Sequence, residues 1–196
     1  MCKARISIVA ALLSLLPVAI CAQQGSSSSE PLEFSEVVQI PDISPQELYT
    51  RAKVWFAEAF IDSKHVLEVE DKAEGLLVGK GSFPYEPSTV RWKPILRGEI
   101  VFTIKLMVKS GRYKCVLRDF RHHGTAMIIR GLGSSGPLDF GLITTDSTPP
   151  SIKGTTENQR QMVWEHLKQV SSTEASRLFL SLKTGMTKDS KESATW

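Results

Sequence analysis

The middle of the chain carries the pattern that most restricts its fold, a predicted β-hairpin. Apolar and polar residues alternate over residues 100–108, Ser110 and Gly111 interrupt the pattern, and the alternation resumes over residues 113–117. A period of two is typical of strands with one buried face, and a two-residue turn fixes the register of the two strands. The predicted cross-strand pairs are Lys109 with Arg112, Val108 with Tyr113, Leu106 with Cys115, and Ile104 with Leu117.

The predicted register separates apolar from basic side chains. Cys115 falls on the apolar face beside Leu106, where a small buried thiol is expected rather than a reactive one. The opposite face carries cations with no acid among them, interrupted by Thr103, Met107 and Val116. The candidate binding residues are therefore Lys105, Lys109, Arg112, Lys114 and Arg118.

Two interpretations of this basic face remain open. It could be the uncovered face of the sheet and contact an anionic partner or another chain. It could instead be an ordinary solvated face whose cations pair with Glu68 and Glu70 on a neighbouring strand. Exposed ion pairs contribute only about 0–1 kcal/mol each, so stability alone would not explain so many cations together.

The N-terminus predicts export. Two basic residues precede an apolar run over residues 6–20, which is shorter than the roughly 20 residues that a membrane-spanning helix needs. Residues 1–22 are therefore interpreted as a signal peptide, cleaved before Gln23. Lipid attachment at Cys21 is the alternative, although Ile20 is larger than the small residue expected before a lipidated cysteine.

Removing this segment changes the charge and the cysteine count. The formal net charge falls from +3 to +1, so the total charge gives no support for binding nucleic acid or an anionic membrane. Only Cys115 remains of the three cysteines, which rules out a disulfide framework. We expect an exported, periplasmic or extracellular chain without a transmembrane helix, and without nucleic acid as its partner.

The remaining patterns predict strands and two helices. Ser44 and Pro45 give an N-cap and a first helical residue, with Glu47 placed to complete a capping box. A second helix is expected over residues 157–183, with a kink or a break near residues 171–174, where the capping pattern repeats. Strands are expected over residues 34–40, 67–70 and 76–83, beside the hairpin, and shorter ones over 126–129 and 138–143.

The order of these elements, β-α-β-β-β-β-α, predicts an α+β fold in which an antiparallel sheet of about five strands is backed by two helices. The expected organisation is a signal peptide (1–22), a Ser-rich flexible leader (23–32), a single domain (33–184) with a Gly/Ser/Pro-rich insertion at about 124–156, and a polar tail (185–196).

Several short motifs also resemble a known family. They are Tyr49-x-Arg51-Ala52-x-x-Trp55, Gly75-x-x-x-Gly79-Lys80-Gly81, and the hairpin segments Phe102-Thr103-Ile104, Gly111-Arg112-Tyr113 and Asp119-Phe120. Over residues 34–123 the chain resembles an uncharacterised family of exported Gram-negative bacterial proteins, a domain of unknown function with a TATA-binding-protein-like fold. The resemblance implies that fold and an exported location, and it brings no activity or functional residues.

No catalytic constellation is evident from the sequence. Phosphate-loop, dinucleotide, nucleophile-elbow and zinc-cysteine motifs are absent from it, and no cofactor or metal is expected. The adjacent residues His122 and His123 should point to opposite faces of an extended segment, which disfavours chelation of one ion.

The preferred hypothesis is an exported, non-enzymatic binding or accessory domain. Its ligand is unknown, and a protein, a peptide or an envelope polymer could contact the basic face and the segment at 131–150. The alternatives are an envelope hydrolase with an unrecognised site near Asp119, His122 and His123, or a structural subunit.

Overall fold

The chain folds into an antiparallel sheet with two helices, as the order of its patterns predicts. The computed structural model describes residues 29–60, 67–87, 96–129 and 133–188. The predicted signal peptide lies outside these residues. In chain order the elements are β1 (Phe34–Gln39), α1 (Pro45–Ala59), β2 (Leu67–Asp71), β3 (Leu76–Tyr85), β4 (Gly98–Lys109), β5 (Arg112–Gly124), β6 (Met127–Ile129), β7 (Gly133–Ser135), β8 (Gly141–Leu142) and α2 (Glu157–Thr187).

The main sheet has the strand order β1-β5-β4-β3-β2, and β8 adds a short pairing to β5. Its centre is the predicted hairpin of β4 and β5, and all four predicted cross-strand pairs are confirmed. Gly111 has a φ of 66° in the two-residue turn, a backbone conformation that glycine adopts without strain. The strands β6 and β7 form a separate hairpin within the predicted insertion.

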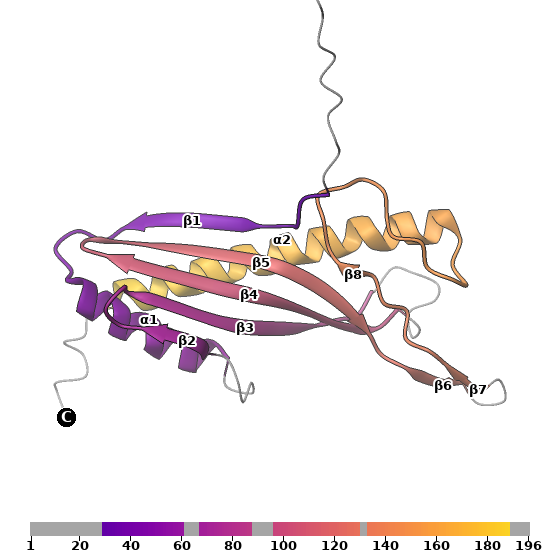
Figure 1. Cartoon of the computed structure of the whole chain (residues 1–196), viewed down its shortest axis with the longest axis horizontal. Helices are drawn as coiled ribbons and strands as arrows, with labels where there is room; N and C mark the ends of the chain where they lie inside the picture. Colours follow the sequence, from indigo (N-terminus) through magenta and orange to yellow (C-terminus); the bar gives the residue numbers. More distant parts are fainter. Residues whose placement is uncertain (1–28, 61–66, 88–95, 130–132, 189–196) are drawn as a thin grey trace, which may run out of the picture.

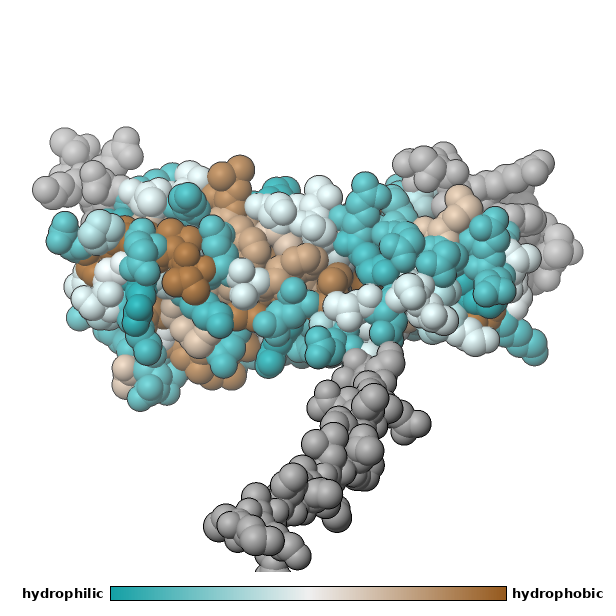
Figure 2. Space-filling model, turned by 90° about the horizontal axis from the view of Figure 1, so that it is seen from above, coloured by the Kyte–Doolittle hydropathy of each residue, from teal (hydrophilic) through white to brown (hydrophobic). Residues whose placement is uncertain are grey.

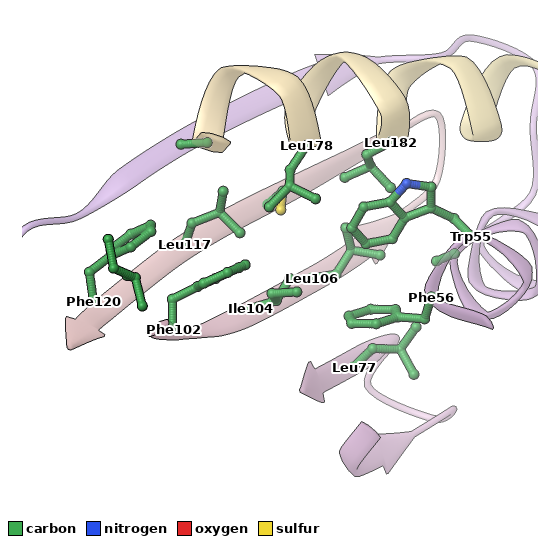
Figure 3. Packing of buried hydrophobic residues seen from close by; sticks show 14 of the residues in the cluster. Trp55, Phe56, Leu77, Phe102, Ile104, Leu106, Leu117, Phe120, Leu178 and Leu182 are labelled. Carbon is green, nitrogen blue, oxygen red and sulfur yellow. The ribbon is translucent and has the colours of Figure 1, made fainter. Parts of the chain in front are cut away.

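Both helices lie on one face of this sheet (Figure 1). The α1 helix begins as predicted, because Ser44 Oγ accepts a hydrogen bond from the Glu47 N–H at 3.2 Å. Leucines of α2 point toward Leu106 and Leu117 of the sheet, and Trp55 of α1 lies beside them (Figure 3). The core is therefore a layer of apolar side chains between the sheet and the helices.

The α2 helix differs from its prediction. It is one helix of 31 residues, without the break expected near residues 171–174, and it continues past the predicted domain boundary at residue 184. The capping residues near the expected break are used otherwise: the Thr173 hydroxyl donates to the Gln169 carbonyl, and Glu174 pairs with Arg177. Burial of Met186 extends the packed part of the helix almost to its end.

Candidate functional site

The five predicted binding residues lie together on the face of the sheet that the helices leave uncovered. Across β4 and β5, Lys109 pairs with Arg112, Met107 with Lys114, Lys105 with Val116, and Thr103 with Arg118. Alternation along each strand puts these side chains opposite the buried Leu106 and Leu117. The basic sheet face is defined here by Lys105, Lys109, Arg112, Lys114 and Arg118.

The expectation that Glu68 and Glu70 neutralise these cations is wrong. Glu68 lies at a register shift in β2 and pairs with Lys80 at 2.7 Å. Glu70 pairs with Lys53 of α1, also at 2.7 Å, because it points to the helix side of the sheet. Both acidic residues that were expected to neutralise the basic sheet face therefore pair with cations outside the five that define it.

Most of the basic sheet face remains without an acidic partner. Arg118 contacts Asp119, with 3.4 Å between Nε and Oδ2. Across the described parts of the chain, the other four cations of the face form no ion pair within 4.0 Å. Four positive charges on two adjacent strands therefore depend on solvent and counterions for their neutralisation.

Apolar side chains interleave with these cations. In one row across the sheet, Val37 of β1 lies beside Lys114, which lies beside Met107 and then Leu76 of β3. Val37 is 56% exposed although it is apolar. A hollow of about 280 Å³ is lined here by Val37, Met107, Lys109, Arg112, Tyr113 and Lys114.

The contribution of β1 to this face is missing from the sequence prediction. The alternation around Phe34 and Val38 shows that Val37 points away from the core, but only the pairing of β1 with β5 brings it beside Lys114. Seen from above, hydrophobic surface gathers over the half of the molecule with β1 and the C-terminal part of α2 (Figure 2). Because Val37, Met107 and Leu76 lie in one row with Lys114, the basic sheet face is amphipathic rather than simply charged.

The proposed hydrolase residues do not form a site. His122 is fully buried, where its Nδ1 accepts a hydrogen bond from the Phe140 N–H at 3.3 Å. Burial lowers the pKa of this histidine to about 4, so its ring is neutral at pH 7. His123 is exposed, as expected for the opposite side of the strand, and Asp119 pairs with Arg118. The three side chains do not converge on one reacting atom.

Cys115 is buried beside Leu106, as predicted. Burial raises the pKa of its thiol to about 12, which keeps it protonated and weakly nucleophilic. Within residues 29–60, 67–87, 96–129 and 133–188, no group of three or more His, Cys, Asp and Glu side chains gathers as metal ligands would.

Neither described helix combines the length and the apolar character that crossing a membrane requires.

Comparison with known proteins finds one matching family model, and the description of that family assigns no activity. Residues 34–123 match the family model described as a domain of unknown function (DUF4468) with TBP-like fold. A crystal structure of a DUF4468 family protein from Bacteroides ovatus is similar, with a TM-score of 0.53, 15% identity, and coverage of 81% of this chain and 88% of that one.

A TBP-like protein from Parabacteroides distasonis is also similar, with a TM-score of 0.51, 10% identity, and coverage of 78% of this chain and 93% of that one. At these identities the likeness concerns the fold. No curated protein matches the chain.

Proposed function

Residues 34–123 match the model of DUF4468, a domain of unknown function with TBP-like fold. From this premise we propose that the chain is a non-enzymatic binding domain whose basic sheet face holds an acidic segment of a partner protein. The observation that carries the proposal is the set of four cations without acidic partners on the uncovered side of the sheet. Nearby acids that would have neutralised the face pair elsewhere, which leaves its charge available to a partner.

The partner should be acidic and partly apolar. Lys105 and Lys109 flank Met107 along β4, so charge and apolar surface alternate every two residues. An extended chain repeats its side-chain directions at the same interval, about 6–7 Å. A segment in which acidic and apolar residues alternate at every second position, and so share one face, would therefore match both the cations and the hollow beside Val37. A purely anionic polymer would use the cations alone.

The domain is proposed to act outside the cytoplasm. This part of the proposal rests on the signal-peptide pattern of residues 1–22, with its basic start, short apolar run and small residue at the cleavage position. Expression with this segment intact, followed by fractionation and N-terminal sequencing, tests it. A cytoplasmic product that retains residues 1–22 would reject export, and a lipid on Cys21 would select the alternative processing.

Binding is tested by reversing charge on the face. The variant Lys105→Glu, Lys109→Glu, Arg112→Glu and Lys114→Glu is compared with a control that reverses four exposed cations elsewhere, Lys153, Arg177, Lys183 and Lys188. The probe is a short fluorescein-labelled peptide of the repeat Glu-Ser-Val-Ser, which places Glu and Val in alternation on one face of an extended chain, and its binding is measured by fluorescence anisotropy. Surface pairs of a few tenths of a kcal/mol each give an expected loss of about tenfold or more for the face variant. The control should retain wild-type affinity.

The same assay separates partner classes. Polyglutamate and a sulfated dextran carry the charge without the apolar side chains, and both should bind more weakly than the alternating peptide. If the sulfated dextran binds as tightly as the peptide, the partner is an anionic polymer and not a protein segment. Equal retention of the peptide by wild type and the face variant would reject the role of the basic sheet face. Circular dichroism verifies that both variants remain folded.

A further inference from the structure

A second site lies at the other end of the molecule, between the start of α2 and the segment that follows β7. It is a cavity of about 350 Å³, within the range of about 300–1,000 Å³ found for small-molecule sites. Its wall is largely apolar and includes buried side chains of three separate segments, Leu96, Phe140 and Val163. The cavity does not include the residues of the basic sheet face.

Arg160 is the charged group of this cavity. One terminal nitrogen, Nη1, donates to the Thr155 carbonyl at 3.0 Å, while Nε is buried and has no hydrogen-bond partner. Among the described residues, no carboxylate lies within ion-pair distance of this guanidinium. A partly buried cation beside apolar surface is costly unless an anion compensates it.

The side-chain oxygens of Thr156 and Gln159 at the cavity are already engaged. The Thr156 hydroxyl accepts from the Gln159 N–H, and the Gln159 side chain accepts from the Thr156 N–H, which completes a capping box. Because Arg160 is the charged side chain among the described residues that line the cavity, its guanidinium is the principal anchor for an anionic ligand. The ligand must therefore supply a single negative group and an apolar body.

We propose that this cavity binds a free monocarboxylate with a medium-length apolar chain, its carboxylate on Arg160 and its chain against Leu96, Phe140 and Val163. Carboxylates match the donor geometry of a guanidinium, and hydrogen bonds between the two are stronger than neutral ones. A water-sized group takes about 30 Å³, so the cavity has room for roughly a dozen such groups. Octanoate is of this size and is the probe for the test.

Isothermal titration calorimetry of the full chain with sodium octanoate, 1-octanol and octylammonium tests the charge requirement. Octanoate should bind at one saturable site, at least tenfold more tightly than 1-octanol, and octylammonium should bind most weakly. Equal affinities for octanoate and 1-octanol would overturn the role of Arg160. Absence of saturable octanoate binding would overturn the site itself.

Two variants and one control locate the site. Arg160→Met keeps the length of the side chain and removes its charge, and it should weaken octanoate binding at least tenfold, equivalent to about 1.4 kcal/mol, while changing 1-octanol binding less than twofold. Arg177→Met on the same helix is the control, because Arg177 is exposed and distant in sequence from the cavity, and it should bind octanoate as wild type does.

Leu138→Phe enlarges a partly exposed side chain of the cavity wall and should weaken both octanoate and 1-octanol. Unchanged octanoate affinity in both Arg160→Met and Leu138→Phe, with thermal unfolding like that of wild type, would reject the cavity as the binding site.

Discussion

Replacing His122 by Asn should remove a large part of the acid sensitivity of folding. The ring of His122 is fully buried, edge-on to Tyr85 and Phe140 with ring centroids 5.1 and 5.6 Å away. Its Nδ1 accepts from the Phe140 N–H, a bond that requires an unprotonated nitrogen. Asn offers an oxygen acceptor near the same position and does not titrate in this range.

The magnitude follows from the difference in pKa between the unfolded and the folded chain. Burial is the main cause that lowers the pKa of His122 from 6.5 to about 4. Between these values the unfolded chain binds more protons, so the free energy of unfolding rises with pH. The contribution of the neutral His122 ring to the free energy of unfolding is fully present above pH 6.5 and is lost as the pH falls toward 4. At about 1.36 kcal/mol per pKa unit, the loss is roughly 2 kcal/mol at pH 5 and roughly 3 kcal/mol at pH 4.

Urea unfolding followed by circular dichroism at pH 7.5, 6.5, 5.5 and 5 measures this effect. The comparison is the change in unfolding free energy with pH, because the substitution also alters stability at neutral pH. The wild type should lose about 2 kcal/mol more than His122→Asn between pH 7.5 and pH 5. His123→Asn is the matched control, since His123 is adjacent and exposed, and it should follow the wild type. Equal losses in the wild type and His122→Asn would refute the reasoning.

Three further predictions concern the core. Ser171→Ala should raise the unfolding free energy by about 1 kcal/mol in urea melts, because the buried Ser171 hydroxyl has no partner; a loss of stability would contradict this. Gly81→Ala should lower the melting temperature by an amount equivalent to about 1–3 kcal/mol, because an added Cβ would lie 2.6 Å from the Phe102 ring. Gly136→Ala is the control and should change the melting temperature little, because an added Cβ there would lie in open space. Similar effects of the two substitutions would be inconsistent with close packing at Gly81. Cys115 should react with a thiol reagent at pH 8 in urea and not in the native protein, since burial raises its pKa to about 12, and rapid native labelling would show an accessible thiol.

The local parts of the fold could be predicted because local chemistry determines them. The turn at Gly111 and the alternation of the hairpin fix the register of β4 and β5 within a short stretch of chain. The cap at Ser44 similarly fixes the start of α1. The continuity of α2 could not be predicted, because a capping pattern near residues 171–174 has the same sequence appearance whether or not the helix is interrupted. The helix is continuous because residues from both of its halves pack into the same hydrophobic core.

The residues of the candidate site could be predicted from the sequence, but the partners and the burial of the side chains around it could be predicted only in part. The five cations could be placed on one face from the hairpin alone. The partners of Glu68 and Glu70 could not, since they depend on how β2 meets β3 and α1 in three dimensions. The burial of His122 likewise depends on Tyr85 and Phe140, which are distant along the chain. Long-range pairings therefore decide which charges remain available.

The late position of α2 in the chain has a consequence for synthesis. The helix follows all the strands that the structure describes, yet it supplies Trp164, Leu167, Leu178 and Leu182 to the core. Its end also reaches back to α1, where Arg51 donates to the Met186 carbonyl at 2.7 Å and Trp55 to the Ser181 hydroxyl at 3.1 Å. A ribosome adds about 5–20 residues per second, so synthesis of α2 is completed several seconds after that of the last described strand. Until then the part of the inner face that α2 covers is exposed, and the nascent chain is a substrate for chaperones that bind apolar strands.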